Sequence, residues 1–123
     1  MSLSQRLRGL RAEEIAADHL ASCGLTVLAR NLRCKAGEID LLGRDGEVLV
    51  VVEVRQRARR DFGGSLGSVS RAKRRKIIRA ARFLLNVRRE WRAYRWRFDV
   101  VGIEGLPDGA HEIAWIKDAF RAT

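Results

Sequence analysis

The sequence predicts an α/β protein with the element order αβββαββ, in which helices flank one mixed central sheet. Two segments of the 123-residue chain, 4–22 and 71–87, repeat apolar residues at helical spacing. Segments 25–32, 37–42, 48–54, 97–103 and 111–116 alternate apolar with polar residues or are rich in β-branched ones, as strands are. The length suits a single domain, so residues 1–123 are expected to share one core.

The central feature is a hairpin within residues 37–57. Its first arm alternates charged and apolar residues, and its second arm is a β-branched run. Asp45 and Gly46 between the arms are typical of a two-residue hairpin turn. A turn at these residues pairs Arg44 with Glu47 and fixes the register of the whole hairpin.

In that register Glu38 lies opposite Glu53, and Asp40 lies opposite Val51. Glu38, Asp40, Glu53 and Arg55 then share one face, because side chains two apart on a strand point the same way. The second arm is apolar on both faces, so Glu53 ends a buried strand, where a carboxylate needs a metal or a counter-charge. The residues therefore favour a cation site over the alternative, a solvated face with an ordinary Glu53–Arg55 pair.

The remaining segments complete the sheet. Gly24 ends the first helix, and strand 25–32 leads into the hairpin to give a three-stranded antiparallel meander. Ser70 is a good N-cap for helix 71–87, and this helix forms a crossover that places strand 97–103 parallel to the second arm. Residues 56–68 between them, glycine-rich and basic, predict a loop, mobile from residue 57 to residue 67 until a polyanion binds. A solvated linker explains this composition equally well.

Charge is distributed unevenly along the chain. The formal net charge is +10, and residues 55–97 hold 16 Lys and Arg against two acids. This asymmetry indicates a polyanion partner, nucleic acid first and an anionic membrane surface second. Aromatic residues among the arginines of residues 88–97 can stack on bases, although ordinary core packing explains them too. The residues expected to contact nucleic acid are Arg57, Arg59, Arg60, Lys73, Arg74, Lys76 and Arg79.

Other classes of protein are disfavoured. No apolar stretch reaches the length of a membrane span, and the first residues lack a signal peptide, so we expect a cytoplasmic protein without a membrane partner. The two cysteines have no zinc-site spacing.

Several short motifs carry a resemblance when they are taken together. An acid in the first helix, then Asp40, then Glu53 two residues before a basic residue, resembles the PD-(D/E)XK nucleases, which include archaeal Holliday junction resolvases. This resemblance implies the restriction-endonuclease-like fold. More closely, segments 37–42, 52–57 and 97–101, the glycine-rich loop and Lys73 resemble the uncharacterised bacterial YraN family. Segment 13–17 and residues 30–31 match in the same order, so the resemblance covers nearly the whole chain.

The resemblance implies a site and an activity. Asp40 and Glu53 would hold Mg²⁺ or Mn²⁺, Glu13 would complete the ligand set, and Glu38 would lie nearby. Arg55 takes the place of the nuclease lysine, where it could stabilise the transition state, and Gln56 could orient water. The implied function is a structure-selective DNA endonuclease.

Two further interpretations remain open. Arginine stays protonated where lysine can change its protonation state, so a catalytically weak or inactive nucleic-acid-binding module is the alternative. A basic adaptor for an acidic protein or ribosomal RNA is a third interpretation. The expected partners are DNA, branched DNA included, or RNA, and the sequence leaves a homodimer open.

Overall fold

The computed structural model describes residues 3–58, 69–105 and 111–122, with side chains from residue 11 to 56 in the first range. It confirms the predicted αβββαββ order and adds one short 3₁₀ helix, η1. The elements are α1 (Leu3–Ser22), β1 (Thr26–Cys34), β2 (Gly37–Asp45), β3 (Val48–Ala58), α2 (Arg71–Val87), η1 (Arg89–Trp91), β4 (Arg95–Gly105) and β5 (His111–Phe120).

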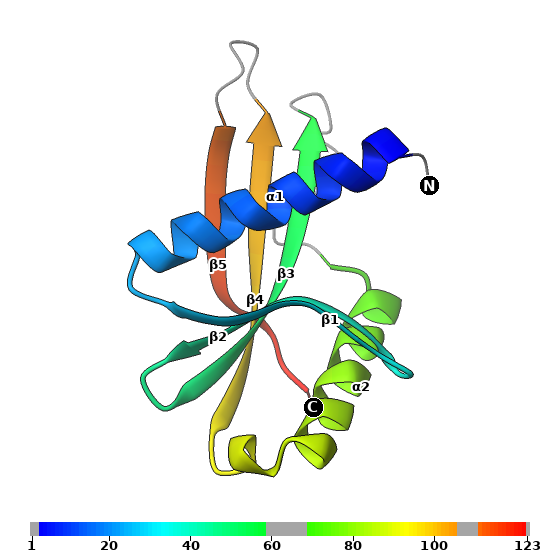
Figure 1. Cartoon of the computed structure of the whole chain (residues 1–123), viewed down its shortest axis with the longest axis vertical. Helices are drawn as coiled ribbons and strands as arrows, with labels where there is room; N and C mark the ends of the chain where they lie inside the picture. Colours follow the sequence, from blue (N-terminus) through cyan, green and yellow to red (C-terminus); the bar gives the residue numbers. More distant parts are fainter. Residues whose placement is uncertain (1–2, 59–68, 106–110, 123) are drawn as a thin grey trace.

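The strands form one five-stranded mixed sheet in the order β1-β2-β3-β4-β5 (Figure 1). As predicted, β1, β2 and β3 form an antiparallel meander, and β4 pairs parallel to β3 after the crossover that contains α2. β5 returns antiparallel beside β4. None of the helices in the described ranges combines the length and apolar character that a membrane span requires.

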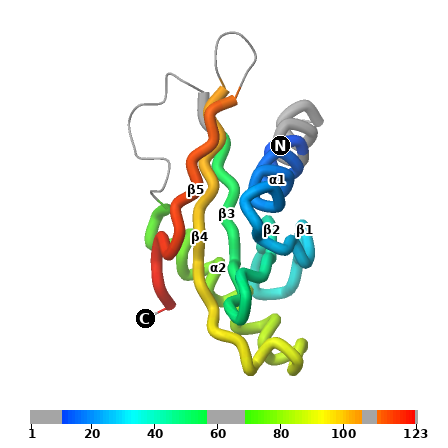
Figure 2. The backbone as a smooth tube through the Cα atoms, turned by 90° about the vertical axis from the view of Figure 1, so that its left-hand side faces the viewer, coloured from blue at the N-terminus to red at the C-terminus, as the bar shows by residue number. Residues whose placement is uncertain are grey.

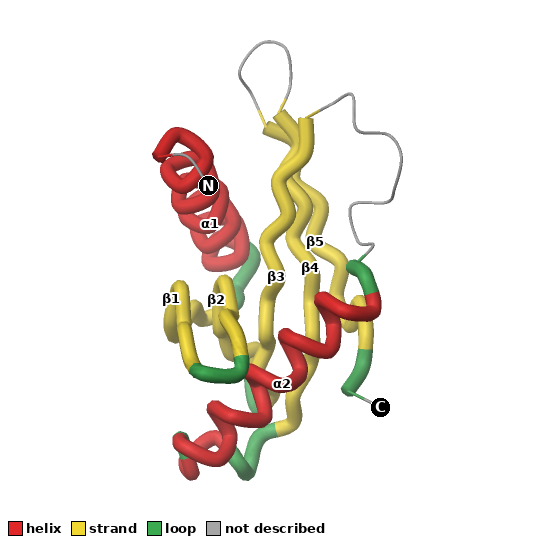
Figure 3. The backbone as a smooth tube through the Cα atoms, turned by 90° about the vertical axis from the view of Figure 1, so that its right-hand side faces the viewer, coloured by secondary structure: helices red, strands yellow, loops and turns green. Residues whose placement is uncertain are grey.

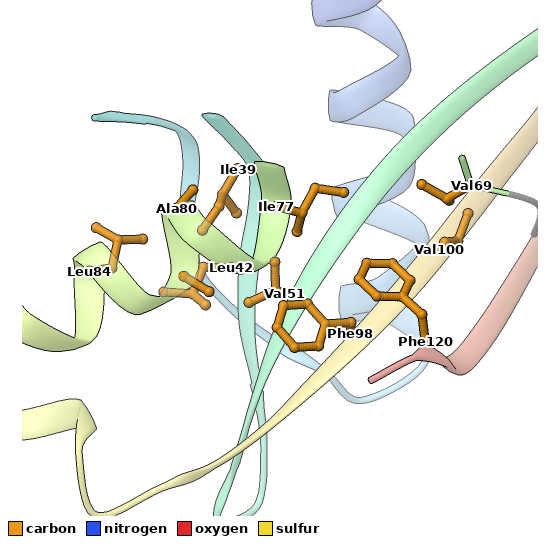
Figure 4. Packing of buried hydrophobic residues seen from close by; sticks show 11 residues of the cluster. Ile39, Leu42, Val51, Val69, Ile77, Ala80, Leu84, Phe98, Val100 and Phe120 are labelled. Atoms are coloured by element: carbon orange, nitrogen blue, oxygen red, sulfur yellow. The ribbon is translucent and has the colours of Figure 1, made fainter. Parts of the chain in front are cut away.

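The two helices cover opposite faces of the sheet (Figure 2). Alternate residues of β3 divide between the two cores, because neighbouring strand residues point to opposite faces. Val50 and Val52 pack with Leu20 of α1, whereas Val51 packs with Ile77 of α2 and other buried residues of that face (Figure 4). The buried strand predicted for the second arm is therefore confirmed.

The N-terminus of α2 begins where we predicted, and the helix packs against the β1–β2 turn. The Oγ of Ser70 accepts a hydrogen bond from the backbone N–H of Lys73 at 3.2 Å, as an N-cap does. A Cβ at Gly37 would lie 3.2 Å from the carbonyl oxygen of Lys76, so the β1–β2 turn contacts the helix backbone (Figure 3). Helix α2 thus bridges that turn and the long strands.

The predicted hairpin register is wrong by two residues. Asp45 pairs with Val48, so the turn residues are Gly46 and Glu47. Gly46 has φ +61°, and a glycine with positive φ at the first central position is typical of a type II′ turn. A shift by two residues keeps every side chain on its expected face.

Several predicted boundaries also need correction. β3 extends to Ala58 and pairs with β4 as far as Gly105, so residues 56–58 belong to a strand and not to the expected loop. β1 lies one to two residues further along the chain than predicted, and β5 continues to Phe120. Residues 59–68, for which we predicted a mobile loop, lie outside the described residues, and Arg59 and Arg60 are among them.

A fully buried acid fixes β5 against β4. The carboxylate of Asp99 accepts two hydrogen bonds from the guanidinium of Arg97, one from the indole N–H of Trp115 and one from the backbone N–H of Asp118, all at 2.9 Å. Asp118 has φ +52°. Four donors compensate the buried charge, so Asp99 has a structural explanation.

Candidate metal and nucleic-acid site

A small polar hollow lies where β2 leaves β3, and its volume is about 250 Å³. Both helices contribute to its wall, although they cover opposite faces of the sheet. The lining residues are Ala12, Glu13, Glu38, Asp40, Glu53, Val54, Gln56 and Lys73. Four of these eight side chains are carboxylates, so the structure brings the predicted metal ligands together.

Asp40 stands at the point where the two strands separate. The last backbone pair of the β2–β3 ladder is Leu41 with Val52, and continuing that register places Asp40 opposite Glu53. Beyond the last pair, the Oδ2 of Asp40 accepts the backbone N–H of Val54 at 2.9 Å. A side-chain acceptor thus takes over from the backbone ladder, and this bond fixes the Asp40 carboxylate in the hollow.

Glu53 is buried, with only 8% of its surface exposed. Its Oε1 lies 3.3 Å from the Nζ of Lys73, which reaches the hollow from α2. Burial, followed by the charge of Asp40, raises the pKa of Glu53 to about 7, against the opposing effect of Lys73. One ammonium group therefore does not fully compensate the acids that face it.

Glu13 reaches the same carboxylates from α1. Burial is the first cause that raises its pKa to about 7, and the charge of Asp40 is the second. Its Oε2 is buried without a hydrogen-bond partner among the described residues. Two glutamates of one hollow thus retain protons near neutral pH, a property that is common at functional sites.

Asn31 is a residue of this site whose role the sequence did not predict. The pairs Arg30–Leu41 and Leu32–Ile39 flank it on β1, so Asn31 lies opposite Asp40. Its φ of +52° is unusual within a strand, and asparagine tolerates this value better than most residues. A hydrogen bond from its side chain acts to lower the pKa of Glu13. The available signal was the residue type, an asparagine inside a strand pattern.

The other predicted site residues occupy the rim or its surroundings. Glu38 lies at the edge of the hollow, and its Oε1 is 3.9 Å from the Nε of Arg33. Gln56 contributes to the wall. Arg55 is partly buried on β3 next to Gly102 of β4 and is not among the described residues that line the hollow.

The basic residues predicted on α2 divide into two groups. Lys73 and Lys76 line a second hollow of about 500 Å³, which adjoins the first because Glu38 and Lys73 border both. Arg79 is exposed. Arg74 is half-buried, with its guanidinium carbon 5.6 Å from the centre of the Phe120 ring, so packing occupies part of this side chain. The side chain of Arg57 lies outside the described residues.

The donor atoms of the hollow suit a hard divalent cation. Carboxylate oxygens are the ligands that Mg²⁺ and Mn²⁺ prefer. The Oε2 of Glu13 has no hydrogen-bond partner among the described residues, so this oxygen is available as a metal ligand. Within the described residues, however, no three Asp, Glu, His or Cys side chains already stand in an arrangement that could hold a metal ion. The residues fit such an ion in kind, and side-chain rotation is needed to close the ligand set.

Comparison with known proteins places the chain in a family. Residues 12–103 match the model of the uncharacterised protein family UPF0102. The chain belongs to this family. The matched range includes every residue that lines the hollow, from Ala12 to Lys73. It also agrees with the expectation of an uncharacterised family.

Whole-chain relatives support the same assignment. A UPF0102 protein from Dechloromonas aromatica is 48% identical over 94% of this chain and 89% of its own length. A second, from Halorhodospira halophila, is 47% identical over 94% of this chain and 88% of its own length. A third, from Stutzerimonas stutzeri, is 43% identical over 99% of this chain and 100% of its own length. The chain and these UPF0102 proteins match over most of their lengths.

Proposed function

We propose that this UPF0102 protein is a phosphodiesterase that depends on Mg²⁺ or Mn²⁺ and cleaves DNA according to its structure rather than its sequence. The observation that carries the proposal is the convergence of Glu13, Asp40 and Glu53, from three separate elements, in one hollow beside a basic helix. Crowded carboxylates repel one another, and a cation relieves that repulsion. We include membership of the PD-(D/E)XK nuclease superfamily in the proposal, because the αβββαββ order and the adjacent strands of Asp40 and Glu53 agree with it.

Each side chain has a role in this proposal. Asp40, Glu53 and Glu13 hold the ion, which when bound supplies positive charge that polarises the scissile phosphate and activates water. Lys73, whose Nζ already reaches the hollow, donates hydrogen bonds to a phosphate oxygen. Gln56 on the wall orients water by its amide group.

The basic surface next to the hollow supports DNA as the substrate. Lys76 and Arg79 are exposed on α2, and neither forms an ion pair with an acid among the described residues. Contacts of this kind bind phosphates without reading bases, because the charge of the backbone is the same for every sequence. Such contacts favour recognition of DNA by its shape over recognition by its sequence.

The second candidate is a nucleic-acid-binding module that does not cleave. Its support is the ion pair between Lys73 and Glu53, since the ammonium already supplies a positive charge to this acid. The absence of a ready-made ligand set among the described residues favours it too. In this candidate the carboxylates hold Lys73 in place for phosphate binding.

Cleavage assays distinguish the two candidates. We expect the parent protein to cut branched DNA in Mg²⁺ or Mn²⁺ faster than single-stranded or duplex DNA of the same sequence. Asp40→Asn should abolish cutting, and Asp45→Asn, which alters an exposed acid of the same strand, should not. Binding without cleavage of any of the three substrates would contradict the nuclease and favour the module.

The salt dependence of binding tests the basic surface in both candidates. Lys76→Glu and Arg79→Glu should each reduce the magnitude of the log–log salt slope by roughly 0.9 for every duplex phosphate that the variant no longer neutralises. Arg44→Glu, at an exposed position near the β2–β3 turn, is the control for charge alone. Fluorescence anisotropy in metal-free buffer measures these slopes. Unchanged slopes in both helix variants would show that nucleic acid binds elsewhere.

A further inference from the structure

A larger hollow lies on the face of the sheet that α2 covers, and the proposed nuclease chemistry does not use it. Its volume is about 650 Å³, within the range of small-molecule sites. It lies between the C-terminal half of α2, the first residues of β4 and the end of β5. None of the acids of the smaller hollow belongs to its wall, so the two hollows are separate.

The apolar part of this wall combines aliphatic and aromatic side chains. The rings of Phe98 and Phe120 are stacked with their centres 5.0 Å apart (Figure 4), and both are buried at the floor of the hollow. Trp96 lines it too and is half-buried. The Nε1 of Trp96 is buried with no hydrogen-bond partner among the described residues. Trp96 is therefore the aromatic residue of this wall that can offer a ring face to a planar group.

The polar part of the wall is cationic. Exposed guanidinium groups of Arg82, Arg95 and Arg121 border the hollow. Arg121 pairs with Asp118 at 3.1 Å, and Arg82 donates one hydrogen bond to the carbonyl of Ala122. Among the described residues, Arg95 pairs with no acid. Positive charge therefore exceeds negative charge at the rim.

We propose that this hollow binds a nucleoside monophosphate unit, either as a free nucleotide or as one nucleotide of a single strand. The base stacks on the ring of Trp96, and Arg95 and Arg82 hold the phosphate, whose oxygens match the forked geometry of guanidinium. Inorganic phosphate alone leaves Trp96 unused, and an uncharged planar molecule leaves the arginines unused. The preference for a nucleotide over other planar anions rests on the proposed function, in which the basic face of α2 binds nucleic acid.

Isothermal titration of the full chain in metal-free buffer tests the proposal with four probes: dTMP, thymidine, inorganic phosphate and phenyl phosphate. We expect dTMP to bind more tightly than each of the other three. Arg95→Ala and Arg82→Ala should each weaken dTMP binding by roughly tenfold, the effect of losing a charged hydrogen bond. Arg75→Ala, an exposed arginine of α2 outside this hollow, is the matched control and should bind dTMP as the parent does.

A short oligo-dT strand distinguishes the two sources of the nucleotide. Tighter binding of the strand than of dTMP, with the same loss in Arg95→Ala, identifies a site for single strands, whereas equal binding identifies a site for free nucleotides. No dTMP binding, equal binding of phosphate or phenyl phosphate, or unchanged affinity in both arginine variants would overturn the proposal. Because no metal is present, these outcomes are independent of whether the protein cleaves DNA.

Discussion

Asp99 and the Glu13–Asp40–Glu53 cluster show two ways of burying acids in one sheet. Asp99 has no exposed surface, and four hydrogen bonds from three residues compensate its charge. The cluster has three acids and one ammonium, that of Lys73, and one glutamate oxygen without a partner among the described residues. The difference indicates that the first acid stabilises the fold, whereas the cluster retains unused capacity for a ligand.

The largest expected effect lies at the compensated acid. Asp99→Asn replaces an acceptor by an amide donor in front of Arg97, so the free energy of unfolding should fall by about 3–5 kcal/mol. Arg97 also contacts Asp45 at 3.3 Å, where the acid is half exposed. Asp45→Asn is therefore the matched control and should change the free energy of unfolding by about 0–1 kcal/mol. Urea denaturation compares them, and equal losses would contradict the assigned role of Asp99.

Replacing an acid of the cluster should have the opposite effect and increase the free energy of unfolding. The pKa of Glu53 is raised from 4.5 to about 7, so the protonated folded form gains stability that is fully present below about pH 4.5 and is lost as the pH rises through 7. Glu53→Gln has no proton to lose there. We expect the variant to gain about 1–3 kcal/mol in unfolding free energy, relative to the parent, between about pH 5 and about pH 8.

Urea denaturation at both pH values measures this gain. Glu47→Gln, at the exposed turn of the same hairpin, is the control for losing a carboxylate from the surface. The difference in unfolding free energy between Glu53→Gln and the parent should change over this pH range. A constant difference would contradict the inference that the charge of Glu53 is poorly compensated.

A smaller effect separates the backbone of Asn31 from its side chain. At φ +52° alanine is strained and glycine is not, so Asn31→Ala should be less stable than Asn31→Gly by about 1 kcal/mol. At Arg30, one residue earlier in β1 and without a positive φ, the order should reverse, because glycine weakens an ordinary strand. Both pairs are compared by urea denaturation. The same order at both positions would show that the conformation of Asn31 contributes nothing.

The sequence predicted the fold well because its signals were local and strong. The apolar face of α2 predicted a helix, and the Ser70 cap predicted where it starts. The β-branched run of β3 predicted a buried strand, and the crossover rule predicted that β4 pairs parallel to it. The turn was harder, since Asp45-Gly46 and Gly46-Glu47 are both acceptable turn dipeptides and tertiary pairing selected the second. Only the even size of the resulting shift preserved the predicted face of Asp40 and Glu53.

The candidate site was predictable in its acids and not in their partners. Alternation along two strands placed Asp40 and Glu53 together, whereas the contact of Lys73 with Glu53 depends on how α2 packs beside the β1–β2 turn. The positive φ of Asn31 depends on strand pairing in the same way. Arg74 looked like any other exposed cation of the helix, and only the position of Phe120 at the end of β5 explains why it is half-buried.

The most direct test of the central claim is calorimetric titration with Mn²⁺ at about pH 8. This pH lies above the raised pKa values of Glu13 and Glu53, so both carboxyl groups have lost their protons. We predict that the parent binds Mn²⁺, that Asp40→Asn binds it at least roughly tenfold more weakly, and that Asp45→Asn binds it as the parent does. Absence of binding to the parent at millimolar Mn²⁺, or equal binding by Asp40→Asn, would show that the acids of the hollow do not form a cation site.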